Sequence, residues 1–255
     1  MLLAIDAGNT NIVVGIFDGA KLKKQWRFKT EKNSGIDELH TQMFAIFNDS
    51  GISFSEIKKT VIASVVPSIH PAINSFCYKY LACSPLWVDA DSTSILTVLY
   101  KATTALGADR IVNAVAAFHK YKTDLIVIDF GTATTFDAVS MAGAYLGGVI
   151  SPGIKIAAEA LFLNTSKLPR IDLADPPEKV IGHDTVSSMK SGIIYGYACL
   201  VDGMVRLIEN EMDKSPLVIA TGGLSMLMCD VCKTIKTVEP DLTLEGLYII
   251  GQESV

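Results

Sequence analysis

An acidic residue stands directly before a small polar cluster in the apolar run "LLAIDAGNTNIVV" at 2–14. The polar residues Gly8, Asn9 and Thr10 predict a turn between two strands, where backbone N–H and hydroxyl donors suit a polyphosphate. Asp6 cannot itself attract phosphate. Its useful role would be to hold a cation, or a water on a cation, that bridges phosphate oxygens. The alternative for a single aspartate here is a residue that shapes the turn by bonding its own backbone.

The same pattern returns in "IVIDFGTATTFDAV" at 126–139. Asp129 then aligns with Asp6, and Thr132 aligns with Asn9. Each copy runs from an apolar strand into Asp-x-Gly, then through a polar cluster into a second apolar strand, which predicts a β-hairpin. Two such hairpins would favour a phosphate site more strongly than either alone, and a nucleotide could lie between them.

The repeat extends beyond the hairpins. Gly19 and Gly143 follow the second strand of each copy and predict its next turn. A fainter similarity joins "TVIASVVPS" at 60–68 to "LVIATGGLS" at 217–225, both short β-branched strands that end in a loop. Chance likeness between any two hairpins is the alternative for the first pair. Two similarities in the same order predict two halves built alike.

The stretch "LGADR" at 106–110 is the best candidate for the chemical step. Asp109 and Arg110 open a helix of otherwise apolar and small residues. Capping of that helix would explain Asp109 alone, because an acidic side chain is favourable near a helix N-terminus. The pair also fits catalysis, since a carboxylate could accept a hydroxyl proton while the arginine fixes a polar substrate.

Other nucleotide-binding motifs are missing from the sequence. It contains no Gly-x-Gly and no Gly-Lys, which excludes the dinucleotide fingerprint, the protein-kinase glycine loop and the P-loop. "TGGL" at 221–224 follows a predicted strand, and its glycines would let an adenine ring approach the backbone closely. A plain strand-to-helix turn explains it equally well.

Helical spacing of apolar residues separates the predicted strands. It predicts helices over 36–48, 108–120 and 185–211, the last beginning near Thr185. Strands that alternate with helices indicate an α/β architecture with two sheets.

The bulk composition narrows the class of protein. Of 255 residues, 49% are hydrophobic and 19% charged, and the net charge is −5, which gives no general reason to bind nucleic acid or an anionic membrane. No apolar run reaches the roughly 18 residues of a membrane span, and no signal peptide is recognisable. Five cysteines suggest a reducing, cytoplasmic setting. The pair Cys229 and Cys232 favours two ordinary thiols over a zinc or redox site.

Taken together, the chain resembles the type III pantothenate kinases of the acetate and sugar kinase/Hsc70/actin superfamily. The resemblance implies two actin-like (ribonuclease H-like) domains, each a mixed β-sheet flanked by helices, with a cleft between them. Residues 1–118 would form the N-terminal domain with the first phosphate-binding hairpin. Residues 119–255 would form the second, with the other hairpin and the adenosine segment. The matching motifs, in family order, are "DAGNTNIVVGIFDG" (6–19), "LGADR" (106–110), "DFGTATTFDAV" (129–139), "GGVISPGI" (147–154) and "SMKSGIIYGY" (188–197).

The family resemblance also implies an activity and a site. The activity would be ATP-dependent phosphorylation of the pantothenate hydroxyl to 4'-phosphopantothenate, the first step of coenzyme A synthesis. Asp109 would be the general base and Asp129 the ligand of a monovalent cation, K⁺ or NH₄⁺, while Mg²⁺ would accompany ATP. The ATP-binding residues would be Asp6, Ala7, Gly8, Asn9, Thr10, Asn11, Ile12, Val13 and Thr132, and the pantothenate-binding residues Tyr100, Gly107, Ala108, Asp109, Arg110 and Thr185.

Family members are similar in forming homodimers with the substrate pocket near the interface, which gives the 185–211 helix a possible second use. Three positions depart from the family pattern: Ala7 replaces the more usual Val or Ile, the segment "KATTA" after Tyr100 lacks the usual Asn-Pro, and Asp184 precedes Thr185 where an uncharged polar residue is commoner. None is catalytic. The competing interpretation is a non-catalytic transcriptional accessory or sensor protein of the same fold. The full set of site residues favours the enzyme.

Overall fold

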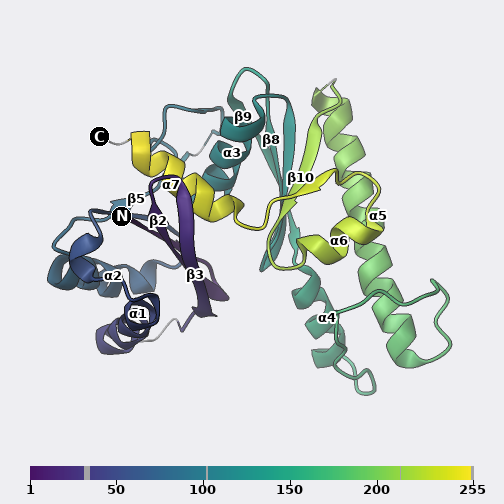
Figure 1. The fold of residues 1–255 in the computed structure, drawn as a ribbon. Helices are drawn as coiled ribbons and strands as arrows, with labels where there is room; N and C mark the ends of the chain where they lie inside the picture. Colours follow the sequence, from purple (N-terminus) through teal and green to yellow (C-terminus); the bar gives the residue numbers. More distant parts are fainter. Residues whose placement is uncertain (32–34, 102, 213, 254–255) are drawn as a thin grey trace. The chain divides into compact units, whose positions relative to one another are not determined.

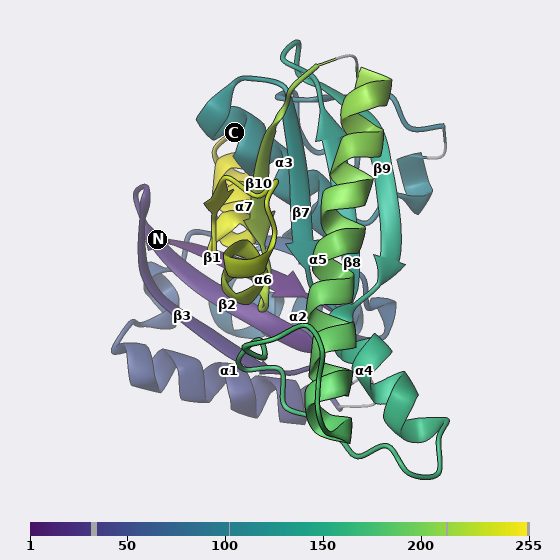
Figure 2. The same ribbon diagram turned by 90° about the vertical axis from the view of Figure 1, so that its right-hand side faces the viewer.

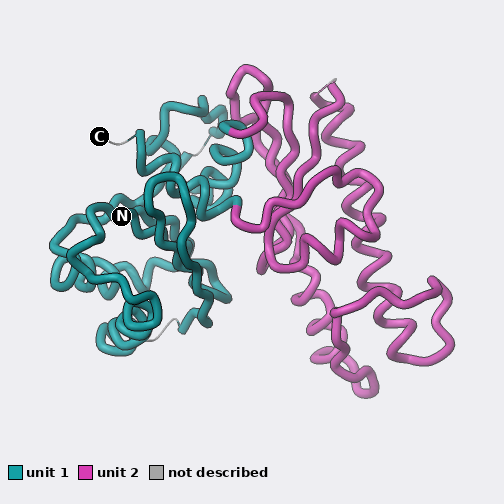
Figure 3. The backbone as a smooth tube through the Cα atoms, viewed as in Figure 1, with its two compact units in different colours: residues 1–119, 242–255 teal, residues 120–241 magenta. Residues whose placement is uncertain are grey.

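The computed structural model describes residues 1–31, 35–101, 103–212 and 214–253. The chain divides into two compact units, Met1–His119 with Leu242–Val255 (unit 1) and Lys120–Asp241 (unit 2), coloured separately in Figure 3. Each unit is described by itself. The helices and strands of both are labelled in Figure 1.

Unit 1 is built on a five-stranded sheet with the order β3–β2–β1–β4–β5. The strand β1 is antiparallel to β2 and parallel to β4. Its residues are almost all buried, as expected for a central strand covered on both faces. The bounds are β1 Leu2–Ala7, β2 Asn11–Asp18, β3 Lys21–Lys29, β4 Lys59–Ser64, β5 Leu86–Trp87 and, outside this sheet, β6 Thr97–Val98.

The helices of unit 1 are α1 Ile36–Ser50, α2 His70–Phe76, α3 Ala108–Tyr121, whose last two residues belong to unit 2, and α7 Leu242–Glu253. The helices predicted over 36–48 and 108–120 are therefore confirmed as α1 and α3. One face of the sheet forms a core with α1 and α2. The helix α7 also packs on this sheet, against β1 and β4.

Close packing explains why α7 belongs to unit 1. A Cβ at Gly246 would lie 2.2 Å from the carbonyl oxygen of Val112, and one at Gly251 would lie 2.6 Å from the Leu2 side chain. The missing side chains let the helix approach both neighbours. The sequence prediction had assigned everything after residue 118 to the second domain, because nothing in the local pattern of 242–253 indicates which sheet the helix covers.

Unit 2 repeats the architecture of unit 1. Its sheet has the order β11–β10–β7–β8–β9, with β7 antiparallel to β8 and parallel to β10. The strands β7 and β10 thus occupy the places of β1 and β4, so the predicted similarity between 60–68 and 217–225 is confirmed. The bounds are β7 Leu125–Phe130, β8 Ala133–Val139, β9 Ala144–Pro152, β10 Leu217–Thr221 and β11 Thr237–Val238.

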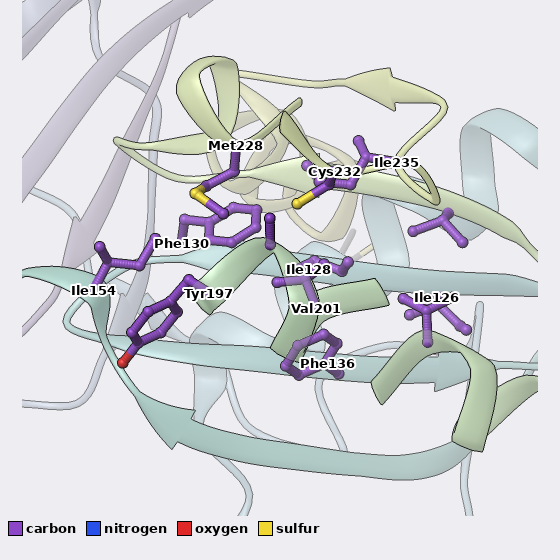
Figure 4. Close-up of a cluster of buried hydrophobic side chains, with 14 of the residues drawn as sticks. Ile126, Ile128, Phe130, Phe136, Ile154, Tyr197, Val201, Met228, Cys232 and Ile235 are labelled. Carbon is purple, nitrogen blue, oxygen red and sulfur yellow. The ribbon is translucent and has the colours of Figure 1, made fainter. Parts of the chain in front are cut away.

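The helices of unit 2 are α4 Ile154–Leu163, α5 Thr185–Met212 and α6 Ser225–Val231. The predicted helix over 185–211 is α5, which runs beside β7 and β8 in Figure 2. Figure 4 shows the core that it closes, where Tyr197 and Val201 of α5 lie with Ile128, Phe136 and Met228. Within the described residues α5 alone has the length and apolar composition of a membrane-crossing helix, a test that buried core helices also pass.

Candidate functional site

The turn of the first hairpin joins β1 to β2 and is held by three backbone acceptors. The N–H of Gly8 donates to the carbonyl oxygen of Asn11 at 3.0 Å. Thr30, directly after β3, donates its N–H to the carbonyl oxygen of Thr10 at 2.9 Å and its hydroxyl to that of Gly8 at 2.6 Å. Asn9 and Thr10 are exposed at the tip. A fixed, exposed turn of small polar residues is the arrangement that binds phosphate through the backbone.

The other predicted ATP-binding residues of this hairpin lie in its strands. Asp6 is partly buried in β1, where it pairs with Val13 of β2 and Ala63 of β4. The side chains of Ala7 and Ile12 are buried in the core of unit 1. Contact of these two with a ligand would therefore go through their backbone.

Asp109 is positioned by the start of α3. Its Oδ1 accepts the backbone N–H of Arg110 at 2.9 Å. A Cβ at Gly107 would lie 2.5 Å from this Oδ1 and 3.7 Å from the Val65 side chain, so glycine makes room for the carboxylate. Burial raises the pKa of Asp109 above its usual value, although the N–H and the positive charge of Arg110 oppose this. The carboxylate is thus a stronger proton acceptor than an exposed aspartate.

The remaining predicted substrate residues of unit 1 differ in exposure. Tyr100 is partly exposed between β6 and the short 3-10 helix Thr103–Ala105. Ala108 and Arg110 are buried in the first turn of α3. The segment after Tyr100 that lacks the usual Asn-Pro includes residue 102, which lies outside the described residues.

The turn of the second hairpin joins β7 to β8 and is one residue shorter in its register. Here Phe130 pairs with Thr134, whereas in the first hairpin Ala7 pairs with Ile12. The N–H of Gly131 donates to the carbonyl oxygen of Ala133 at 3.0 Å, and Thr132 is exposed at the tip.

Two glycines pack against this second hairpin. A Cβ at Gly153, the residue after β9, would lie 2.1 Å from the carbonyl oxygen of Thr132. A Cβ at Gly222, which has φ +90°, would lie 2.4 Å from Oδ1 of Asp129. Contact with the hairpin therefore requires a glycine at position 222 of the "TGGL" motif. This explains one glycine of that motif without any ligand.

Asp129 could hold a singly charged cation. It pairs with Thr135 of β8 on one side and with Thr221 of β10 on the other, so a threonine stands opposite it on each neighbouring strand. Oxygen donors suit hard cations. Among the described residues, no group of three or more His, Cys, Asp or Glu side chains is arranged to hold a metal. A single carboxylate fits a monovalent cation better than a stripped divalent one.

Thr185 lines an open pocket of about 930 Å³ in unit 2, between α4 and the start of α5. Asp184 accepts the N–H of Ser187 at 2.9 Å through its Oδ1, and this bond holds the pKa of Asp184 below its usual range. The unusual aspartate before Thr185 therefore caps α5. A second pocket of about 390 Å³ is lined by Leu224 of the "TGGL" segment together with Lys155, Glu159 and Arg170.

Sequence reasoning missed Thr30, and it named Gly153 only as part of the motif at 147–154, without a role. Asn11 pairs with Lys29, the last residue of β3, and Ala133 pairs with Pro152, the last residue of β9. Thr30 and Gly153 thus occupy equivalent places one residue further on, and both contact their turn. Extending the repeat from the second strand to the end of the third would have found them.

Proteins of one named family match most or all of this chain. The family model described as type III pantothenate kinase matches residues 2–207. The proteins named type III pantothenate kinase from Desulfosudis oleivorans and Desulforapulum autotrophicum are 54% and 53% identical to this chain. The first alignment covers 100% of both chains, and the second covers 100% of this chain and 98% of the relative.

Solved structures extend the likeness to the fold. The (R)-2-hydroxyglutaryl-CoA dehydratase component A of Acidaminococcus fermentans has a TM-score of 0.60 at 13% identity, covering 99% of this chain and 96% of that one. The ethanolamine utilization protein EutJ of Carboxydothermus hydrogenoformans has a TM-score of 0.60 at 13% identity, covering 98% and 89%. These likenesses, with the repeated sheet order, confirm the predicted actin-like fold. By its family match and its full-length relatives, the chain belongs to the type III pantothenate kinase family.

Proposed function

We propose that this chain transfers the terminal phosphoryl group of ATP to the hydroxyl group of pantothenate. The observation that carries this beyond family membership is the pair of Asp-x-Gly hairpins at equivalent places in two like sheets. Each presents an exposed polar turn suited to phosphate. Phosphoryl transfer needs positioning and charge neutralisation more than covalent help from the protein.

In this mechanism Asp109 accepts the hydroxyl proton of pantothenate as its oxygen attacks the γ-phosphorus. The new O–P bond forms while the bond to the β-phosphate oxygen breaks, and ADP leaves. Gly107 leaves space beside the carboxylate of Asp109. The raised pKa of Asp109 favours uptake of the proton. Each of the turns at 8–11 and 131–133 would bind phosphate, with Thr132 donating from the second.

Cations complete the charge balance. Magnesium bound to ATP neutralises phosphate charge, and Asp6 would hold it or its water. Asp129 would hold K⁺ or NH₄⁺ among the oxygens of its neighbouring threonines. Leu224 and its pocket would receive the adenosine end of ATP.

In this proposal pantothenate binds in the pocket around Thr185, and a second copy of the chain covers that pocket. The pocket is open, and large apolar side chains stand exposed on the segments beside it, with Ile181 at 76% and both Val180 and Leu163 at 66%. Exposed apolar groups in such number favour association. Ile181→Asp should convert a dimer to a monomer in analytical ultracentrifugation, whereas Met226→Asp, at an exposed residue of α6, should not.

The kinase proposal is tested by ADP release with pantothenate, ATP and Mg²⁺, in K⁺ and in Na⁺. Asp109→Asn should lower kcat by roughly 10²–10⁴-fold, the usual contribution of a general base. Its affinity for a non-hydrolysable ATP analogue should stay unchanged. Asp37→Asn, in the first turn of α1, is the matched control. A near-normal rate in Asp109→Asn would show that another group takes the proton. Absence of turnover in the wild-type chain, with ATP binding intact, would favour a sensor.

A further inference from the structure

The residue that follows β3 is bonded to the first phosphate-binding turn, although neither the motif nor the repeat includes it. Thr30 is buried, with 6% of its surface exposed. Its hydroxyl donates to the carbonyl oxygen of Gly8 at 2.6 Å, and its N–H donates to that of Thr10 at 2.9 Å. One buried residue thus holds the two carbonyl groups on either side of Asn9.

These two bonds decide which backbone groups the tip can present. An anion is bound where successive N–H groups face it and carbonyl oxygens face away. The carbonyls of Gly8 and Thr10 are directed at buried Thr30, while the side chains of Asn9 and Thr10 are exposed at the tip. Thr30 therefore fixes the peptide orientation that an approaching phosphate requires.

Unit 2 provides an internal comparison. The equivalent residue there is Gly153, which follows β9 as Thr30 follows β3. Gly153 meets the carbonyl oxygen of Thr132 by close approach, since a Cβ would lie 2.1 Å from it. Both hairpins are thus braced from the end of the third strand. The hydroxyl brace is specific to the first.

We propose that Thr30 is a positioning residue for ATP, acting through the backbone of the turn at Gly8–Asn11. This rests on the proposed function only in naming ATP as the ligand. Thr30→Val keeps the β-branched shape and the N–H bond to Thr10 but removes the hydroxyl from Gly8. The loss of one hydrogen bond to the binding turn should weaken ATP binding about tenfold.

The experiment compares wild type, Thr30→Val, Thr30→Ser and Thr60→Val in the full chain. Thr60 is a buried threonine of β4 whose hydroxyl lies 3.4 Å from Sγ of Cys83 and does not touch the turn. Calorimetry with a non-hydrolysable ATP analogue gives Kd, and steady-state rates give KM for each substrate. Melting temperatures measure general loosening of the fold.

Thr30→Val should raise Kd for the analogue and KM for ATP about tenfold, with KM for pantothenate within twofold of wild type. Thr30→Ser should restore ATP binding, and Thr60→Val should leave it unchanged. An unchanged Kd in Thr30→Val overturns the proposal, as does an equal loss in Thr60→Val at a matched melting temperature. Should Thr30→Val not fold, Thr30→Ala is judged by the same criteria.

The two proposals fail in different ways. If pantothenate is not phosphorylated but Thr30→Val still weakens analogue binding, the kinase assignment fails and the role of Thr30 stands. Normal turnover with unchanged analogue binding in Thr30→Val refutes the role of Thr30 alone. A wild-type chain that does not bind the analogue overturns both.

Discussion

The two hairpins of this protein begin alike and end differently. Both carry Asp-x-Gly on a strand that lies between an antiparallel and a parallel neighbour. At the tip, Gly8 bonds to Asn11 in the first, whereas Gly131 bonds to Ala133 in the second. The first turn is braced by hydrogen bonds from a buried threonine, and the second by close packing of a glycine.

This difference separates the architecture that both units share from the tips, in which they differ. Sheet order and the buried strands are the same in both units, because each sheet must bury its faces against helices. The tips differ in length and in the residue that holds them. Loss of one Thr30 hydrogen bond removes only part of the support of the first turn. A single methyl group added at Gly153 would disrupt the packing that supports the second turn.

Gly153→Ala tests that steric brace and should have the largest effect. The new Cβ would lie 2.1 Å from the Thr132 carbonyl oxygen and 2.9 Å from that of Gly131, and backbone atoms cannot swing aside. Overpacking of this kind costs up to about 3 kcal/mol. At 2–4 °C per kcal/mol, calorimetry should show a fall in melting temperature that reaches about 6–12 °C at the full 3 kcal/mol. Gly203→Ala, with open space around its site in α5, is the control, and equal melting of the two variants would contradict the prediction.

Asp109 belongs to unit 1 but to neither hairpin, so its titration separates proton transfer from phosphate binding. In the proposed mechanism the ionised form is the base, so kcat/KM for pantothenate should fall about tenfold per pH unit below the pKa of this carboxyl. Burial raises that pKa, so the fall should begin at a higher pH than for an exposed aspartate. A pH–rate profile measures it.

The same shift makes a statement about stability. The folded state binds this proton more tightly than the unfolded chain, so ionisation of Asp109 costs folding free energy at neutral pH, and the cost disappears as pH falls. Asp109→Asn should therefore melt no lower than wild type at pH 7. A lower melting point would mean that the charge is stabilised by contacts stronger than the burial that opposes it.

Replacing each hairpin aspartate in turn with asparagine tests whether Asp6 and Asp129 hold different cations. Asp129→Asn should raise the K⁺ concentration for half-maximal rate about tenfold, the effect of losing one charged ligand. Asp6→Asn should leave that concentration unchanged and raise KM for Mg–ATP instead. Initial rates over a K⁺ series, with Na⁺ as the replacement ion, measure both. Identical responses of the two variants would show that the hairpins share one cation role.

The smallest effect should come from Thr134→Val in the second hairpin. The Thr134 hydroxyl is fully buried and has no hydrogen-bond partner among the described residues. Removing it should stabilise the protein by about 1 kcal/mol, or about 2–4 °C in melting temperature. The same substitution at Thr30 should destabilise. Loss of stability in both variants would show that the two hydroxyls play like roles.

The hairpins, the repeat and the main helices were predictable from sequence because each has a local pattern. Asp6 and Asp129 stand in matching apolar strands, and the spacing over 185–211 is that of one long helix. The turn difference was not predictable, because the register of one residue is set by pairing across strands. Thr30 was missed for the same reason: its partner Gly8 is distant in sequence, and its neighbours in β3 are ordinary strand residues.

The membership of α7 in unit 1 has a consequence for synthesis on the ribosome. The whole of unit 2, residues 120–241, is translated before Leu242–Glu253 emerges to cover β1 and β4. Until α7 is made, one face of the central strands of unit 1 stays uncovered, while unit 2 can already fold. The half that is made first is completed last, in contrast to the usual order in which N-terminal domains fold first.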